Sequence, residues 1–356
     1  IMHALKRFGT AFGGYKMMEN YPVPECGPDD IILEIKAAAI CGADMKHWGV
    51  DNGYDDTNIT PDQQQSVRGH EFAGEIVKVG ENVKDWHIGQ RVVSDNSAHV
   101  CGVCPACEQG DFLCCEHKVN LGLDNNTWGG GFSKYCKVPG EILAIHKHAI
   151  WEIPEGIKYE EACVLDPICN AYKAVAQQSH LIPGQDVVVF GTGPLGLFSV
   201  QVAKLMGAVN IVMVGLDDDV KVRFGVAKEL GATHCVNGSK EDVVARCTEI
   251  CGRDNLGLVI ECSGANIALK QAIEMTRPNA EIVRVGMGFK PLEFSINDIT
   301  AWNKSIIGHM AYDSTSWRNC IRLLQSGQIK VQPMITHRLG LSQWQEGFDK
   351  MAKKEA

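Results

Sequence analysis

Residues 184–208, "GQDVVVFGTGPLGLFSVQVAKLMGA", decide the fold class of this chain. The run DVVVF is apolar after its first residue, as expected of a strand that is buried on both faces of a parallel sheet. Three glycines in the pattern G-x-G-x-x-G follow it, and then a stretch long enough for a helix. A strand, a tight glycine turn and a helix in this order are typical of a dinucleotide-binding βαβ unit.

Each glycine of this turn has its own expected role. We expect Gly191 to make the turn, Gly193 to let a pyrophosphate approach the backbone, and Gly196 to let the helix pack against the strand. Pro194 and Leu195 begin the helix, whose N-terminus would face the phosphates. The alternative is an ordinary glycine turn without a ligand.

The next predicted strand, "NIVMVGLDDD" (210–219), bears on the choice of cofactor. An acid near its end is expected to contact the ribose hydroxyls, about twenty residues after the glycines. Gly215 stands at the predicted tip, so Asp217 is the expected contact. Because three adjacent aspartates would repel a 2′-phosphate, NAD is favoured over NADP. Lys221 and Arg223 would serve NADP instead, and a solvated acidic turn is the structural alternative.

Two more apolar strands, "LGLVIECSGAN" (256–266) and "AEIVRVGMGF" (280–289), alternate with helical stretches. This alternation predicts an α/β, doubly wound parallel sheet. We assign residues 159–298 to this nucleotide domain. Residues 1–158 and 299–356 would form a second, catalytic domain.

A cysteine-rich segment predicts a structural metal site. Three cysteines with two-residue gaps are followed seven residues later by a fourth: Cys101, Cys104, Cys107 and Cys115. Four thiolates satisfy tetrahedral zinc and leave no position for a substrate. Cys114 could replace Cys115 in this set. Most of the other cysteines lie singly in apolar surroundings and are interpreted as buried small hydrophobes.

Four residues from separate segments are candidates for a catalytic metal site: Cys41, His70, Glu71 and Asp166. One Cys, one His and one carboxylate form a three-ligand set that leaves a coordination position open for water or substrate. The sequence alone does not show that these segments meet.

Composition excludes other classes of protein. The chain has 356 residues and a net charge of −9, with no basic run, which argues against a nucleic-acid partner. No apolar run reaches the roughly 18 residues of a membrane span. We therefore expect a cytoplasmic protein without a membrane partner, in which thiols stay reduced.

The segment 69–83 reads G-H-E-x2-G-x5-G-x2-V. Together with the cysteine segment and the glycine turn, it resembles the zinc-containing medium-chain dehydrogenase/reductase family, most closely its polyol (sorbitol-type) branch, over essentially the whole chain. The resemblance implies a GroES-like, mainly-β catalytic domain beside a Rossmann domain, and a homodimer or homotetramer. It also implies two zinc ions per chain, one catalytic and one structural.

Residue roles follow from the same resemblance. Cys41 and His70 would ligate the catalytic zinc, Glu71 would bind it directly or through water, and Asp166, the fourth candidate ligand, stands where relatives carry Cys, Glu or Asp. The family's register selects Cys115 for the structural zinc. Backbone at Val285 and Gly286 would meet the nicotinamide amide.

The segment "CGADMKHW" (41–48) departs from the family pattern C-G-[ST]-D-x-H. Ala43 lacks the hydroxyl that relays the alcohol proton, and Lys46 replaces the histidine. His47, Glu71 or a zinc-bound water are the candidates for the proton path.

These features predict an NAD-dependent, zinc-dependent oxidoreductase that takes a hydride from a secondary alcohol. The favoured substrate is a small-molecule polyol. An L-threonine 3-dehydrogenase or a small secondary-alcohol dehydrogenase is the rival within the class. A non-catalytic NAD-binding scaffold or sensor is the rival outside it.

Overall fold

The apolar run at 186–190 forms β10, a strand with every residue buried. The structure, a computed structural model, describes residues 1–8, 14–48, 65–288 and 290–356. β10 belongs to a six-stranded sheet of order β12-β11-β10-β13-β14-β15, in which every neighbouring pair is parallel. The direction of winding reverses between β10 and β13. In such sheets, ligands bind at the carboxyl ends of the strands beside this switch point.

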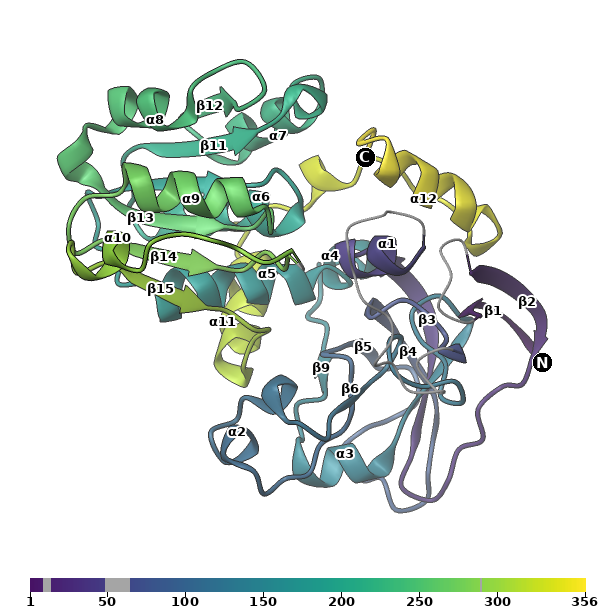
Figure 1. The fold of residues 1–356 in the computed structure, drawn as a ribbon. Coiled ribbons are helices and arrows are strands. Elements are labelled where there is room, and N and C mark those ends of the chain that lie inside the picture. The colour runs from purple at the N-terminus through teal and green to yellow at the C-terminus, as the bar shows by residue number, and fades with distance from the viewer. Residues whose placement is uncertain (9–13, 49–64, 289) are drawn as a thin grey trace. The chain divides into compact units, whose positions relative to one another are not determined.

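Helices alternate with the strands of this sheet (Figure 1). Right-handed crossovers place α6 and α7 on one face and α8 and α9 on the other, and residues of α8 and α9 share one apolar core with the strands. The elements from α5 onward are α5 (Leu165–Tyr172), a π-helix (Lys173–Gln178), β10 (Asp186–Phe190), α6 (Pro194–Leu205), β11 (Ile211–Gly215), η4 (Asp217–Asp219), α7 (Arg223–Leu230), β12 (His234–Asn237), α8 (Val243–Cys251), β13 (Leu256–Glu261), α9 (Asn266–Met275), β14 (Glu281–Arg284), α10 (Asn297–Thr300), β15 (Ser305–Gly308) and α11 (Ser314–Gln325).

The N-terminal half is built on an antiparallel five-stranded sheet of order β8-β3-β4-β5-β9. Its inner face, with the loops that cover it, forms a second apolar core. Its elements are β1 (Met2–Arg7), β2 (Tyr15–Tyr21), β3 (Ile31–Ala39), α1 (Gly42–Trp48), β4 (Glu71–Val79), β5 (Arg91–Ser94), β6 (Ser97–His99), α2 (Pro105–Glu108), η2 (Phe112–Cys114), β7 (Val119–Asn120), β8 (Tyr135–Val138), α3 (Gly140–Ile145), β9 (Ile150–Glu152) and α4 (Tyr159–Ala162), and α12 (Trp344–Ala352) follows near the C-terminus.

The chain divides into two compact units. The first comprises 1–166, 313–317 and 337–353, and the second 167–312, 318–336 and 354–356. Our domain assignment places its second boundary at 298, whereas β15 follows this boundary and still pairs in parallel with β14. The units therefore include this edge strand with the parallel sheet.

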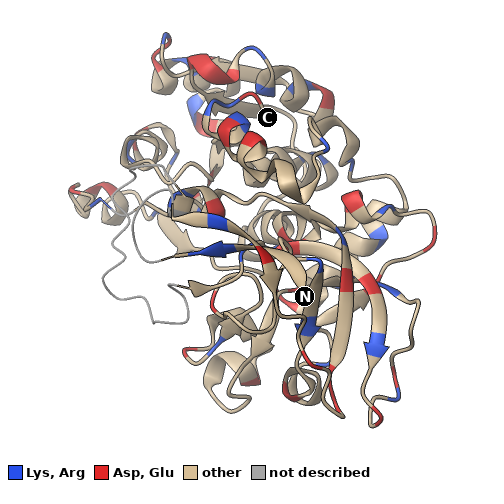
Figure 2. Cartoon of the chain, turned by 90° about the vertical axis from the view of Figure 1, so that its right-hand side faces the viewer, with Lys and Arg blue, Asp and Glu red and all other residues tan. Residues whose placement is uncertain are grey.

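The expected fold class is confirmed: a mainly-β domain and a doubly wound parallel sheet occur in one chain. Among the described residues, no helix is both long and apolar enough to cross a membrane. Lysine and arginine are interspersed with aspartate and glutamate over both units (Figure 2).

Candidate active site and structural metal site

Cys41, His70 and Glu71 converge on one place in the first unit. β3 and β4 run antiparallel, and their register pairs Ala39 with Glu71. Cys41 follows the end of β3 by two residues and His70 directly precedes β4, so the two strands deliver all three side chains to the same end of the sheet. Their ligand atoms lie within 4.8 Å of one another.

The electrostatics of this group fit a bound cation. Burial raises the pKa of the Cys41 thiol well above its usual value, and the carboxylates of Glu71 and Asp44 raise it further. Burial also raises the pKa of Glu71, and the neighbouring Asp166 adds to this effect. His70 Nδ1 is buried without a hydrogen-bond partner among the described residues. Thiolate, imidazole and carboxylate are the ligands that zinc prefers, and a divalent charge would compensate this buried set.

Asp166, the fourth predicted ligand, lies outside the converged group of three. Its Oδ2 accepts a hydrogen bond from Asn96 Nδ2 at 3.0 Å, and both side chains are buried. Asn96 takes a left-handed conformation, with φ of 60°, which asparagine tolerates better than most residues. The structure thus places Asp166 close enough to influence Glu71 and gives its carboxylate a protein partner.

Three supporting residues went unnoticed in the sequence. The carboxylate of Asp44 accepts the backbone N–H of Cys41 at 3.1 Å and lies 3.8 Å from His70 Nδ1. Arg68 contacts the same carboxylate at 3.4 Å, and Tyr15 donates to the Asp44 carbonyl. An aspartate three residues after a candidate ligand, at the start of a helix, is a signal for such capping.

The segment that departs from the family pattern forms α1. The backbone N–H of Ala43 faces the Cys41 sulfur at 3.5 Å. Lys46 is half-buried, and burial lowers the pKa of its ammonium group. His47, a candidate for the proton path, belongs to α1, but its side chain lies outside the described part of the structure.

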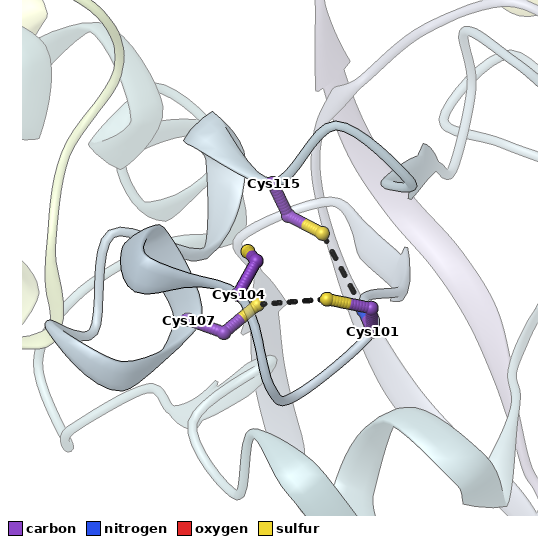
Figure 3. A group of neighbouring side chains, drawn as sticks. All are labelled: Cys101, Cys104, Cys107 and Cys115. Atoms are coloured by element: carbon purple, nitrogen blue, oxygen red, sulfur yellow. Dashed lines mark hydrogen bonds between the residues drawn. The ribbon is translucent and has the colours of Figure 1, made fainter.

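The four cysteines of the predicted structural site come together in one loop. Cys101, Cys104, Cys107 and Cys115 place their sulfurs within 4.8 Å of one another, and Figure 3 shows the sulfurs facing a common space. Cys101 Sγ lies 3.9 Å from Cys107 Sγ, and the Cys101 N–H donates to Cys115 Sγ. Cys114 is exposed and outside the group.

The protonation of these thiols is unequal. A hydrogen bond from the backbone of Val103 lowers the pKa of Cys101 to about 6, whereas burial raises that of Cys107 to about 12. Four thiols this close cannot all ionise without a cation, which fits a metal that the set would bind as thiolates. The loop is anchored by Phe112, whose ring packs on His146, and His146 in turn pairs with buried Asp95 at 2.5 Å.

The glycine turn between β10 and α6 has the shape of a phosphate cradle. Gly191 has φ of +93°, which only glycine adopts readily. A Cβ atom on Gly196 would lie 1.8 Å from the Gly191 carbonyl oxygen. A Cβ atom on Gly193 would meet nothing within 4 Å, so the backbone is open there. Pro194 is the first residue of α6, and Leu195 follows it in the first turn.

The other predicted cofactor residues lie at the carboxyl ends of two further strands of the same sheet, β11 and β14. Asp217 begins η4 after β11, with its side chain half exposed. Val285 and Gly286 follow β14, and both backbone N–H groups donate to the carbonyl of Glu261 at 2.8 Å. Arg284 also contacts Glu261: its guanidinium pairs with the buried Glu261 carboxylate at 3.0 Å.

Two family models match the chain. Residues 27–148 match the alcohol dehydrogenase GroES-like domain, and residues 194–326 match the zinc-binding dehydrogenase domain. Three relatives match over most of both chains. The chain is 78% identical to the "Uncharacterized zinc-type alcohol dehydrogenase-like protein YdjL" of Escherichia coli (strain K12), covering 100% of this chain and 97% of that protein. It is 29% identical to a sorbitol dehydrogenase of Halalkalibacterium halodurans (100% and 97%), and 32% identical to an L-threonine 3-dehydrogenase of Rhizobium rhizogenes (94% and 91%).

Solved structures share the fold. The 2R,3R-butanediol dehydrogenase of Bacillus subtilis superimposes with a TM-score of 0.84 at 29% identity, covering 100% of this chain and 97% of that one. A zinc-binding dehydrogenase of Sinorhizobium meliloti 1021 bound to NADP matches with a TM-score of 0.81 at 27% identity (98% and 95%). A short chain alcohol dehydrogenase (rspB) of E. coli CFT073 complexed with NADH matches with a TM-score of 0.84 at 27% identity (99% and 95%).

Proposed function

Since this chain belongs to the zinc-type alcohol dehydrogenase family and is an oxidoreductase, we propose that it transfers a hydride from a secondary alcohol group of a sugar alcohol to NAD. The observation that carries the proposal is the convergence of Cys41, His70 and Glu71, in which His70 Nδ1 makes no hydrogen bond among the described residues and lies 3.8 Å from Asp44. Three ligands leave one coordination position for a substrate oxygen, which a purely structural site would not need.

Two zinc ions are proposed per chain. The first would be held by Cys41, His70 and Glu71, with Asp166 nearby, and the second by the four cysteines of the loop. Zinc at the first site supplies a Lewis acid that lowers the pKa of an alcohol oxygen. The loop has no spare ligand position, so its metal would contribute to folding rather than to chemistry.

The protein's own groups would position the reactants. Asp44 holds the backbone of Cys41 and lies beside His70, and it is itself held by Arg68. Ala43 cannot relay a proton, so Glu71 and His47 are the side chains proposed for that task. Gly193 leaves its backbone open to the pyrophosphate, and the N–H groups at the start of α6 would face it.

The substrate class rests on the relatives. The sorbitol dehydrogenase supports a polyol, whereas the L-threonine 3-dehydrogenase, at 32% identity, supports the rival within the class. The butanediol dehydrogenase supports a small secondary alcohol. We further propose a cytoplasmic homodimer or homotetramer. All fifteen cysteines of the chain lie in described segments and have free thiols there, as expected in a reducing compartment.

The test is a substrate panel with purified protein of measured zinc content. Polyols, L-threonine and 2,3-butanediols are offered with NAD and with NADP. We expect oxidation of a polyol, with kcat/KM for NAD at least about tenfold above that for NADP, or about 1.4 kcal/mol. Preferred oxidation of L-threonine would reassign the substrate. A protein that binds NAD and only one zinc, and oxidises none of these alcohols, would instead be the non-catalytic scaffold.

A further inference from the structure

We infer that Asp219, rather than Asp217, is the residue that selects between NAD and NADP. The inference rests on the proposed function insofar as this requires a bound nicotinamide dinucleotide. It concerns the adenosine end of the site, and all the residues it uses belong to the second unit.

The end of β11 has no side chain of its own to meet a ribose. β11 pairs with β10, and the N–H of Gly191 bonds to the Val214 carbonyl, so the tip of β11 lies beside the glycine turn. Gly215 stands at this tip. A Cβ atom there would lie 2.7 Å from Thr192 Cγ2 and 3.0 Å from Asp219 Oδ2. A larger residue at 215 would therefore clash with Thr192 and crowd the Asp219 carboxylate.

Asp219 fills the place that Gly215 leaves. The chain turns back in η4, and Asp219 Oδ2 accepts the N–H of Leu216 at 2.8 Å. The side chain is 4% exposed. Its Oδ1 has no hydrogen-bond partner among the described residues, although two cations lie at longer range. A buried carboxylate oxygen beside the glycine turn, with its hydrogen-bonding capacity unused, is suited to accept hydroxyl groups from a ribose.

Asp217 is engaged elsewhere. Its carboxylate accepts from Asn237 Nδ2 at 2.7 Å and pairs with Lys240 at 3.1 Å. Its backbone N–H donates to Ser239 Oγ. These partners lie at the end of β12 and just after it, on the far side of β11 from β10. Asp218 is exposed and serves as the control position.

Two cations flank Asp219, so its charge determines whether a 2′-phosphate is repelled or attracted. Arg223 Nη1 lies 3.7 Å and Lys354 Nζ 3.5 Å from Asp219 Oδ1. With Asp219 ionised, a 2′-phosphate would meet a buried like charge, which is unfavourable. Without that charge, the same two cations would attract the phosphate, although Arg223 also donates to the Ala356 carbonyl at 2.8 Å. One side chain therefore both binds the ribose and excludes NADP.

The experiment measures direct binding of NADH and NADPH to the full chain, without any alcohol present. Asp219→Asn keeps an oxygen for the Leu216 N–H but removes the charge. We expect it to weaken NADH binding at least about tenfold and to strengthen NADPH binding, reversing or abolishing the preference. Asp218→Asn is the matched control and should change either affinity less than about twofold.

Asp217→Asn tests the rival residue. If it carries the loss of NADH affinity while folded Asp219→Asn binds as the wild type does, the inference is wrong. Should Asp219→Asn fail to fold, Arg223→Gln keeps the carboxylate and removes a cation, and it should weaken NADPH binding by at least about threefold relative to NADH. An unchanged ratio in that variant would also overturn the inference. A wild-type protein that binds neither nucleotide would instead refute the proposed function itself.

Discussion

Arg68 Nη2 lies 3.4 Å from Asp44 Oδ1, and the two side chains are 1% and 0% exposed. This ion pair sits directly behind the candidate metal ligands, because the same carboxylate caps the backbone of Cys41 and approaches His70. Arg68 has further partners in Ser66 Oγ and the Leu123 carbonyl. The ligand geometry is therefore coupled to the stability of the first unit.

Asp44→Ala should destabilise the protein by about 3 kcal/mol, because it leaves the buried Arg68 charge without its counter-ion. Urea denaturation measures the loss. Asp85→Ala, which removes an exposed aspartate of the same unit, is the matched control and should cost less than about 0.5 kcal/mol. Equal midpoints for the two variants would show that the ion pair does not stabilise the fold.

The two proposed metal sites should respond differently to cysteine substitution. Cys41→Ser is expected to leave a folded protein with one zinc and negligible turnover. Cys107→Ser should lower the melting temperature by about 10 °C or more, because the loop loses a metal whose binding free energy contributes to folding. Zinc content, melting temperature and turnover are measured for both.

Cys114→Ser is the control for this pair, since Cys114 is exposed and outside the sulfur group. It should keep both zinc ions and melt within about 2 °C of the wild type. Normal melting of Cys107→Ser with full zinc content would rule out the structural-zinc assignment. Full activity of Cys41→Ser would rule out the catalytic one.

The variant Asp166→Asn tests whether Asp166 is a zinc ligand or only lies near the zinc site. Asp166 lies outside the group of three, and its carboxylate is already bonded to Asn96. We therefore expect the variant to retain the catalytic zinc, in contrast to Cys41→Ser, while turnover falls. Elemental analysis after dialysis decides between the two roles. Loss of one zinc, as in Cys41→Ser, would make Asp166 a direct ligand.

His309 should make the second unit sensitive to mild acid. Burial, with a contribution from Lys173, lowers its pKa from 6.5 to about 4, and its ring nitrogens face Gln178 and Asn170. Since the unfolded chain binds this proton more tightly, the stabilisation that neutral His309 contributes is fully present above pH 6.5. It is lost as the pH falls through 4, and the free energy of unfolding decreases by about 3 kcal/mol at most.

The measurement compares unfolding free energies of the wild type and His309→Gln between pH 7 and pH 4. The unfolding free energy of the wild type minus that of the variant should fall towards acid. Taking this difference removes contributions that both proteins share, such as metal release. A constant difference across this range would show that His309 is not the responsible group.

Features that lie within one short segment could be predicted from the sequence. The strand, glycine turn and helix at 186–205 are predicted correctly, because burial, positive φ and close packing each demand a residue type at a fixed local spacing. The cysteine loop is local in the same way: fifteen residues contain all four sulfurs. Together with the segment 69–83, both motifs also carried the resemblance to the family, and with it the expected fold class.

Which distant side chains meet, and in which direction they point, could be seen only in the folded chain. Cys41 and Glu71 come together because β3 and β4 pair in one particular register, and Asp166 is bonded by Asn96, seventy residues away. Asp217 and Asp219 have the same side chain and nearly the same position in sequence, yet one faces solvent and the other is buried beside the glycine turn. The path of the chain after β11 sets that difference. Gly215, at the end of β11, lies close to Thr192 of the glycine turn, and the local spacing of the aspartates does not encode this approach.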